Sequence, residues 1–332
     1  VLEAVDTERF DPLPIGITKD GNWHHYLGTY SAIAAGTWVD DPMLLRPAAF
    51  SPSRGAPGFW ELHNGKWMLR RIDLAFPVLH GKNGEDGTVQ GLFELSGIPL
   101  VGCGTLASAL CMDKDRAHKL AELAGADAHK LVSLAGIAVP KSVVLEKNTT
   151  AARQKILDTL SFPVFVKPVR AGSSFGVTRV ESRDALGTAV DAAFRYDSSV
   201  IVEEAVPGFE VGCAVLGTDT LTVGRTDEIE LSGGFFDFEE KYMLKTSRIH
   251  MPARVDAATE LRIQETAKTI YRALGCSGFA RVDLFLTPSG ELVFNEVNTI
   301  PGLTAHSRFP NMMKGIGLSF PQMIDRLLGL YV

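Results

Sequence analysis

The stretch Gly278-Phe-Ala-Arg-Val-Asp-Leu-Phe-Leu-Thr-Pro-Ser-Gly-Glu-Leu-Val-Phe-Asn-Glu-Val-Asn298 has alternating apolar and polar residues on each side of a Pro-Ser-Gly turn. Such a pattern predicts two antiparallel strands, in which side chains two residues apart share one face. The polar face of this hairpin carries Arg281, Asp283, Glu296 and Asn298. If the turn centres on the Pro-Ser pair, Arg281 lies opposite Glu296 and Asp283 lies diagonal to it.

This polar face offers hard oxygen ligands, without a histidine or a cysteine. Magnesium and manganese prefer such ligands, whereas zinc prefers nitrogen and sulfur. Asp283, Glu296 and Asn298 therefore predict a divalent-metal site. A hairpin face held by salt bridges explains the same residues, so the choice depends on the rest of the chain.

Composition is that of a soluble protein with more than one domain. The 332 residues predict two or three packed units, and a net charge of −6 without a Lys/Arg block disfavours binding to nucleic acid or to an anionic membrane. The sequence has no apolar run of about 18 residues and no basic leader. Four scattered cysteines without CxxC spacing fit reduced core residues of a cytoplasmic protein.

Three lobes are expected, over residues 1–104, 105–197 and 198–332. In the first lobe, the apolar runs 13–18, 72–79 and 97–102 predict parallel strands of an α/β layer, with a helix over 87–95. The Pro/Ser/Gly-rich stretch 46–65 predicts a surface excursion.

The central and C-terminal lobes are expected to be α+β units around a cleft. Helices are predicted over 105–136, and the central lobe has predicted strands over 142–145 and 163–167 around a helix over 149–160. The C-terminal lobe has predicted strands over 200–204, 210–216 and 221–225 and a helix over 257–274.

The segment Ala117-His-Lys-Leu-Ala-Glu-Leu-Ala-Gly125 nearly recurs as Ala128-His-Lys-Leu-Val-Ser-Leu-Ala-Gly136. The offset of eleven residues is about three helical turns, so a second copy keeps its apolar face in register. We interpret the repeat as a duplicated helical segment without chemistry.

A lysine at a predicted strand end precedes a Gly/Ser loop in Lys167-Pro-Val-Arg-Ala-Gly-Ser-Ser-Phe-Gly176. Glycine lets the backbone approach an anion, and Ser173, Ser174 and the lysine charge can bind it. The segment predicts a phosphate cover that differs from a Walker A loop, with a plain Gly/Ser turn as the alternative.

Two other strand ends carry candidate binding residues. Glu203 and Glu210 flank a turn, where carboxylates can accept hydrogen bonds from an adenine amino group or from ribose hydroxyls; a solvated loop explains them equally well. His80 precedes a helix whose N-terminal amides can face an anion. Glu85 and Asp86 in the same loop fit helix caps.

Seven stretches, in order, resemble the D-alanine:D-alanine ligase family: HGKNGEDGT, MDKDRAHK, FVKPVRAGSSFGV, VEEAVPGFEVG, FFDFEEKYMLKTS, GFARVDLF and NEVNTIPGLTAHSRFP. The resemblance covers nearly the whole chain and is greatest to the VanG-type D-alanine:D-serine ligases of vancomycin resistance. It implies an ATP-grasp fold with the nucleotide between the central and C-terminal lobes. It also implies a cytoplasmic, homodimeric enzyme of peptidoglycan synthesis that uses ATP and two magnesium ions, or manganese.

The resemblance implies roles for the nucleotide-binding residues. Lys114 and Lys167 would contact the ATP phosphates, under a loop that contains Ser173 and Ser174. Adenine would be held by Glu203 and the Val206 backbone, ribose by Glu210, and the metals by Asp283, Glu296 and Asn298.

The resemblance also implies catalytic and substrate-binding residues. Arg281 would stabilise the tetrahedral intermediate, and His80 would lie near the first D-amino acid. Lys241 and Tyr242 would cover the site, with Tyr242 bonded to Ser173. Gly302 and Ser307 would receive the carboxylate of the second substrate.

The implied chemistry is consistent with these residues. ATP converts D-alanine to an acyl phosphate, and positive groups offset the charge on the transferred phosphoryl group. The second amino acid then attacks the mixed anhydride. Closure of the two loops would exclude water from this intermediate.

The sequence also bears on the identity of the second substrate. Lys241 and Tyr242, which D-lactate-type ligases lack, imply an amine, either D-alanine or D-serine. We hypothesise that Arg308, with Phe235 shaping the wall, supplies space and a donor for the hydroxyl of D-serine. Anchoring of a substrate carboxylate or of the cover loop is the alternative role for Arg308.

Three other functions compete with this one: a housekeeping D-alanine:D-alanine ligase, a different ATP-grasp ligase and a non-enzymatic ATP-binding protein. The family pattern also begins with a glycine-rich strand and a helix bearing a glutamate for the first D-alanine. Both would precede Val1, so we expect that they are missing from this sequence.

Overall fold

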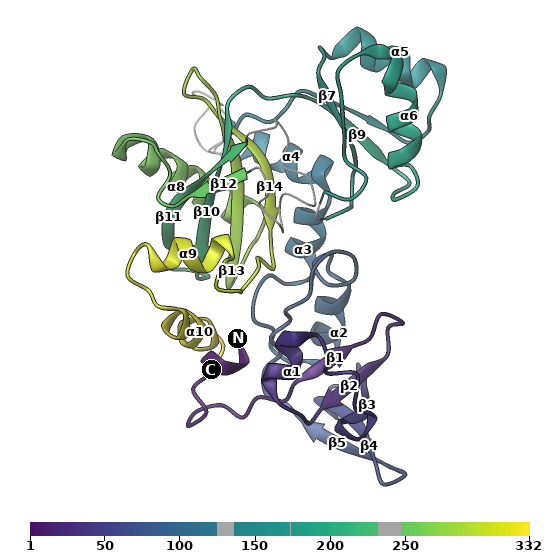
Figure 1. Ribbon diagram of the computed structural model, residues 1–332, viewed down its shortest axis with the longest axis vertical. Helices are drawn as coiled ribbons and strands as arrows, with labels where there is room; N and C mark the ends of the chain where they lie inside the picture. Colours follow the sequence, from purple (N-terminus) through teal and green to yellow (C-terminus); the bar gives the residue numbers. More distant parts are fainter. Residues whose placement is uncertain (125–135, 173, 232–246) are drawn as a thin grey trace.

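The structure is a computed structural model that describes residues 1–124, 136–172, 174–231 and 247–332. These residues form three antiparallel sheets (Figure 1), with the N-terminal sheet at the bottom, the C-terminal sheet at the upper left and the central sheet at the upper right. The helices α2 (Thr88–Ser96), α3 (Thr105–Met112) and α4 (Lys114–Leu123) lie between them. No helix within the described ranges is long and apolar enough to cross a membrane.

The N-terminal sheet is an antiparallel meander in the order β1-β2-β3-β4-β5. Its strands are Ile15–Ile17, Trp23–Tyr26, Leu45–Phe50, Gly58–His63 and Lys66–Arg71, and the helical segments of this lobe before α2 are η1 (Leu2–Ala4), α1 (Tyr30–Ala35) and η2 (Pro42–Leu44).

The helix expected over 87–95 in this lobe is confirmed as α2, but the parallel sheet expected beside it was wrong. Run 13–18 contributes β1 to an antiparallel sheet, and runs 72–79 and 97–102 meet only through one parallel bridge, between Ala75 and Leu100. Pro77 and Pro99 interrupt these two runs. Proline has no N–H to donate to a strand ladder, which limits the pairing.

The surface excursion expected over 46–65 was also wrong, because these residues supply most of β3 and all of β4. The hairpin that joins β4 to β5 turns at Asn64-Gly65, with φ angles of 50° and 74°. An Asn-Gly pair between alternating residues is a strong hairpin signal, and our sequence analysis missed it.

The central sheet has the antiparallel order β6-β9-β7-β8 and packs against two helices. The elements are β6 (Ser142–Leu145), α5 (Thr150–Thr159), β7 (Val164–Pro168), β8 (Thr178–Val180), α6 (Arg183–Ala193) and β9 (Val200–Glu204). The two strands and the helix predicted for this lobe are confirmed to within about two residues. The strand predicted over 200–204 is also confirmed, but its expected place in the C-terminal lobe was wrong, because β9 pairs with β6 and β7 of this sheet.

The C-terminal sheet has the antiparallel order β12-β11-β10-β13-β14. The elements are β10 (Phe209–Leu216), β11 (Thr222–Leu231), β12 (Ser247–His250), α8 (Ala257–Ala273), β13 (Phe279–Leu286), β14 (Leu292–Asn298), α9 (Arg308–Lys314) and α10 (Phe320–Leu328). Alternate residues of β10 enter two different cores: Cys213 and Val215 pack with α8, while Ala214 and Leu216 pack with α9 and α10.

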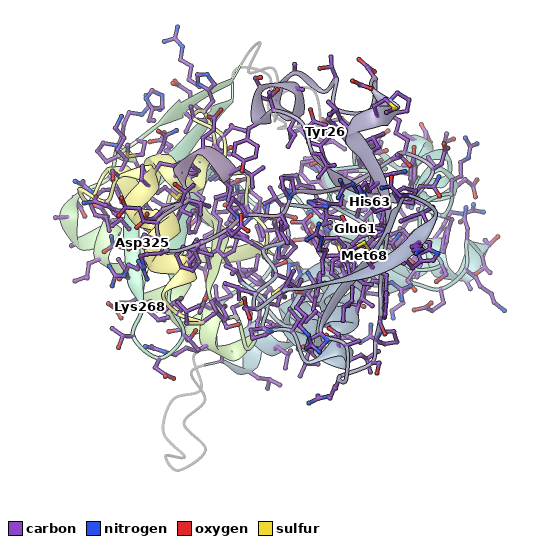
Figure 2. All side chains as sticks on the ribbon, turned by 90° about the horizontal axis from the view of Figure 1, so that it is seen from below. Tyr26, Glu61, His63, Met68, Lys268 and Asp325 are labelled. Atoms are coloured by element: carbon purple, nitrogen blue, oxygen red, sulfur yellow. The ribbon has the colours of Figure 1, made fainter. Side chains whose placement is uncertain are left out.

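The first and last segments of the chain lie together. Figure 1 shows both ends of the chain near α10, and η1 packs in the same core as that helix. Seen from below in Figure 2, the C-terminal helices that carry Lys268 and Asp325 lie on one side and the N-terminal sheet with Glu61 lies on the other.

The β13–β14 hairpin exists as predicted, but its register was wrong. Arg281 lies opposite Asn298, and Asp283 lies opposite Glu296. The turn centres on Ser289, so the pairing partner lies one residue later than expected, and an irregularity between Asp283 and Leu284 shifts the pairing by one more. The two shifts preserve the alternation, so the four polar residues still share one face.

Two further expectations concern the cysteines and the repeat. All four cysteines are free and buried, as expected for core residues. The first copy of the repeat lies largely in α4, whereas the second copy lies almost entirely outside the described residues, so its structure stays a prediction.

Candidate functional site

The polar face of the hairpin continues across four strands of the C-terminal sheet. Asp227 on β11 lies opposite Gly212 on β10, and Gly212 lies opposite Asp283 on β13. Asp283 in turn lies opposite Glu296 on β14. One row across the sheet therefore holds three carboxylates with a glycine between them.

Arg281 binds the central carboxylate of this row. Its Nε lies 2.8 Å from Asp283 Oδ1, and its Nη2 lies 2.8 Å from Asp283 Oδ2. Both side chains are buried, with Asp283 only 1% exposed. Because the two residues are neighbours on one strand face, the sheet fixes the orientation of the guanidinium.

Arg308, the first residue of α9, is also held by carboxylates. Its Nε and Nη2 each donate to Asp227 at 2.7 Å, and its Nη1 donates to Glu210 at 2.8 Å. The same Nη1 lies 3.3 Å from Asp283 Oδ1. Every nitrogen of this guanidinium therefore faces an acid, and the freely available donor expected from the sequence is absent.

A cavity of 1570 Å³ opens beside this row, between the C-terminal sheet and the N-terminal lobe. Its polar wall includes eight of the residues predicted to form the site, namely His80, Lys114, Arg281, Glu296, Asn298, Gly302, Ser307 and Arg308. The opposite wall comes from the N-terminal lobe and is largely apolar, including Trp23, Trp38 and Phe50.

The residues beside the cavity fit a divalent cation. Asn298 Oδ1 is buried and has no hydrogen-bond partner among the described residues, and Glu296 lies near it at the same end of β14. Among the described residues, no cluster of three or more His, Cys, Asp or Glu side chains is arranged to hold a metal. Asp283 lies opposite Glu296, behind the cavity wall, with Arg281 contacting both of its oxygens. Asp283, Glu296 and Asn298 together offer a partial shell of hard oxygens, which suits an ion that takes further oxygens from phosphate or water.

The predicted nucleotide-binding residues meet where the central sheet faces α4 and β14. Lys167 Nζ lies 2.6 Å from Glu203 Oε2. Lys114 Nζ donates to the Ala171 carbonyl at 3.0 Å and lies 3.9 Å from Glu296 Oε2. Burial opposes the charged form of Glu203, but the adjacent Lys167 holds the pKa of this carboxyl below its usual value.

His118 belongs to this group, although our sequence analysis assigned it no role. Its Nε2 lies 2.8 Å from the Asn295 carbonyl, and its Nδ1 lies 3.8 Å from Glu203 Oε1. Within the part of the chain that the structure describes, both Nδ1 and Glu203 Oε1 are buried without a hydrogen-bond partner. The sequence signal was available, because His118 lies one helical turn after Lys114 on α4 and shares its face.

Two side chains of the N-terminal lobe that line the cavity, Glu85 and His80, have shifted pKa values. Burial raises the pKa of Glu85 to about 7, and Glu296 nearby adds to the rise. Desolvation lowers the pKa of His80, with Arg281 contributing in the same direction. Glu85 was expected to be a helix cap; its side chain instead accepts a hydrogen bond from the Gly81 amide.

The remaining predicted residues are placed as follows. Ser307 Oγ accepts from the Thr304 amide at 3.0 Å, and Gly302 approaches Ser307 so closely that a Cβ would lie 2.7 Å from its Oγ. Ser174 has a φ of 58°, and Val206 is half-buried after β9. Ser173, Phe235, Lys241 and Tyr242 lie outside the described residues.

Two family models match this chain over most of its length. The model described as "D-ala D-ala ligase N-terminus" matches residues 1–103, and "D-ala D-ala ligase C-terminus" matches residues 131–329. The chain belongs to the D-alanine–D-alanine ligase family. It is a D-amino acid ligase with the three-sheet fold of that family, as the resemblance implied.

Three relatives show how this ligase stands within the family. It is 60% identical to the solved VanG D-Ala:D-Ser ligase of Enterococcus faecalis, covering 100% of this chain and 92% of that one, with a TM-score of 0.91. It is 46% identical to the vancomycin B-type resistance protein VanB of E. faecalis, covering 100% and 92%. It is 39% identical to the D-alanine–D-alanine ligase of Caldicellulosiruptor bescii, covering 100% and 89%.

Proposed function

We propose that this ligase joins D-alanine to D-serine at the expense of ATP, through a D-alanyl phosphate intermediate. The observation that carries the proposal is the 60% identity, across the whole chain, to a solved D-Ala:D-Ser ligase. The product would give altered peptidoglycan precursors and resistance to vancomycin. The enzyme would act in the cytoplasm, where these precursors are made.

In this proposal the fold is an ATP-grasp fold, and ATP lies between the central and C-terminal sheets. Lys114 and Lys167 face that junction from two different elements and would contact the phosphates. Glu203 and the Val206 backbone would bind adenine, and Glu210 would bind ribose. The buried, unpartnered Glu203 Oε1 supports the adenine assignment, because it is an acceptor without a donor.

Asp283, Glu296 and Asn298 would hold the magnesium or manganese ions. When bound, these ions offset the negative charge that develops on the transferred phosphoryl group. Arg281 faces the cavity in a fixed orientation and would stabilise the oxyanion of the tetrahedral intermediate.

His80 would lie beside the first D-alanine, while Gly302 and Ser307 would receive the carboxylate of the second substrate. Ser173, Lys241 and Tyr242 would belong to the loops that cover the site and exclude water from the acyl phosphate. Deprotonation of the incoming ammonium group must precede its attack, since only the neutral amine is a nucleophile.

Arg308 is our proposed contact for the serine hydroxyl, with Phe235 shaping the wall of the pocket. Because three carboxylates hold the guanidinium, Arg308 offers a fixed positive charge on the cavity wall rather than a mobile donor. A pocket arranged around a hydroxyl rejects a substrate without one more strongly than an apolar pocket rejects an added hydroxyl.

The test is phosphate release from MgATP with D-alanine alone, then with D-serine or D-lactate added, with the products identified by mass. We expect D-alanyl-D-serine to dominate at equal concentrations of D-alanine and D-serine. D-alanyl-D-alanine alone would identify a housekeeping ligase, and a depsipeptide would contradict an amine as the second substrate. ATP binding without any product would contradict the ligase proposal.

Arg308→Leu tests the specificity hypothesis separately. We expect the ratio of kcat/KM for D-serine to kcat/KM for D-alanine to fall, in addition to a loss common to both substrates because Arg308 also contacts Glu210 and Asp283. An equal loss of kcat/KM for both substrates would contradict a role in selecting the hydroxyl.

A homodimer is also part of the proposal, and light scattering of the purified protein would test it.

A further inference from the structure

Asp227 is a buried acid on β11 that has no role in the proposed chemistry. Its side chain is only 1% exposed. Oδ1 accepts from Arg308 Nη2 at 2.7 Å and from the Gly212 amide at 3.1 Å, while Oδ2 accepts from Arg308 Nε at 2.7 Å. Asp227 therefore holds Arg308 from one side, with both oxygens in use.

The other side of Arg308 points at the reaction centre. Nη1 is the nitrogen left over from the pairing with Asp227, and it bridges Glu210 at 2.8 Å and Asp283 at 3.3 Å. Under the proposed function, Glu210 binds ribose and Asp283 binds metal. The guanidinium of Arg308 thus contacts both a proposed ribose ligand and a proposed metal ligand, and Asp227 determines how that guanidinium is oriented.

Gly212 makes this arrangement possible. It lies between Asp227 and Asp283 in the row across the sheet. A Cβ at this position would overlap Arg308 Nη2 and lie 2.6 Å from Asp227 Oδ1. The guanidinium therefore occupies the space that a side chain would fill on any other residue.

We propose that Asp227 is a positioning residue, which fixes Arg308 so that its Nη1 holds Glu210 and Asp283 in place for nucleotide and metal. This inference rests on the proposed function, because it takes the roles of Glu210 and Asp283 from it. The paired planes of a carboxylate and a guanidinium give a defined orientation, which a single hydrogen bond does not.

The adjacent residue on β11 provides a matched comparison. Glu228 is also a buried acid paired with an arginine, and its Oε1 lies 2.6 Å from Arg254 Nη2. Arg254, however, is 52% exposed and contacts none of the predicted site residues among the described interactions. Glu228→Gln therefore removes a similar ion pair from the same strand without affecting the reaction centre.

The experiment compares Asp227→Asn with Glu228→Gln and the unmodified protein. Binding of ATP is measured by titration calorimetry, and binding of Mn²⁺ in the presence of ADP is measured from the paramagnetic resonance signal of the free ion. We expect Asp227→Asn to weaken Mn²⁺ binding at least five-fold and ATP binding at least three-fold. Glu228→Gln should change both affinities by less than two-fold.

Steady-state kinetics add a second readout. For Asp227→Asn we expect KM for MgATP to rise at least three-fold, and high Mg²⁺ to restore part of the lost activity. If Asp227 were needed only for folding, Asp227→Asn would lower the thermal midpoint, but the folded protein would keep its affinities and the usual Mg²⁺ dependence of its activity. A lowered midpoint with unchanged affinities would overturn the proposal.

Gly212→Ala provides an independent variant if Asp227→Asn does not fold. It keeps every charge but displaces Arg308, so we expect the same direction of change in Mn²⁺ affinity. Unchanged Mn²⁺ affinity in both folded variants would contradict the positioning role. Failure of the unmodified protein to bind ATP and Mn²⁺ would instead contradict the proposed function, so the two failures are distinguishable.

Discussion

The N-terminal and C-terminal sheets both bury carboxylates among positive groups, but only the group at the C-terminal sheet has members that line the cavity, namely Arg281, Glu296 and Arg308. In the N-terminal sheet, Glu61 is fully buried and accepts from His25 at 2.7 Å, Arg46 at 3.1 Å and Arg70 at 2.8 Å. Both of its oxygens have donors, and it does not line the cavity.

The C-terminal site is less completely satisfied. Asn298 Oδ1, on the cavity wall, is a buried acceptor without a hydrogen-bond partner among the described residues, and so is Glu203 Oε1 on β9 of the neighbouring central sheet. A buried polar atom without a partner costs free energy, so its presence at a cavity indicates a place for a ligand. The comparison teaches that an unpartnered acceptor on a cavity wall, rather than the number of buried charges, distinguishes the candidate binding site. His24 Nδ1 in the N-terminal sheet also lacks a partner among the described residues, but it does not line the cavity.

The largest effect should come from Glu296→Gln. Removal of this proposed metal ligand is expected to lower kcat about 10²- to 10³-fold, because charge on the transferred phosphoryl group is then poorly offset. Ligation activity and the thermal midpoint should be measured together. Activity within ten-fold of the unmodified enzyme would contradict the view that this site is the functional one.

Glu61→Ala should show the opposite behaviour. It leaves Arg46 and His25 without their buried partner, so we expect the free energy of unfolding to fall by about 3 kcal/mol. Turnover per folded molecule should stay within two-fold. Urea unfolding and ligation rates separate the two quantities, and a selective loss of turnover would remove the distinction between the sheets.

The pH dependence of stability should sharpen this distinction. Although burial opposes its charged form, hydrogen bonds from His25 and Arg70 hold the pKa of Glu61 at about 2, below its ordinary value of 4.5. Its contribution is therefore present above pH 4.5 and lost as the pH falls towards 2. Between pH 5 and pH 3, urea unfolding should show a steeper loss of stability for the unmodified protein than for Glu61→Gln. Parallel curves would mean that Glu61 is not stabilised in its charged form.

The smallest effect is expected at an exposed pair. Arg9 and Asp325 form an ion pair between the N-terminal segment and α10, and both side chains are about half exposed. Solvent screens such pairs, so Arg9→Ala should cost less than about 1 kcal/mol, and added salt should reduce even that cost. A larger loss in urea unfolding would show that Arg9 contributes through packing on Phe10 as well.

Alternating patterns in the sequence predicted the hairpin, its shared polar face and most elements of the two later lobes. The register of the hairpin was not predictable from the turn alone, because the irregularity beside Asp283 depends on how both strands pack. The same alternation was overlooked in β4 and β5, where the Asn64-Gly65 turn gave a usable signal. The runs around Pro77 and Pro99 were predicted to be strands because they are apolar, although neither proline has an amide N–H to donate to a strand ladder.

The site residues were predictable where a motif or a strand face carried them, as for Arg281 and Glu296. Asp227 was missed because we expected its strand to end at Arg225, whereas β11 continues to Leu231. Its partner Arg308 lies on α9, far away in the sequence, so pairing between the two requires the folded chain. The spacing of His118 from Lys114 shows a shared helix face, but its partners, the Asn295 carbonyl and Glu203, are brought to that face only by the folded chain.

The row formed by Asp227, Gly212 and Arg308 has a consequence for how relatives of this ligase can diverge. Exchanging Arg308 for an apolar residue buries Asp227 without a counter-charge, and exchanging Gly212 for a larger residue displaces the guanidinium. Each single step is therefore unfavourable, whereas joint replacement need not be. Lineages that lose the arginine should have lost the aspartate with it, so these positions should vary together when many family members are compared.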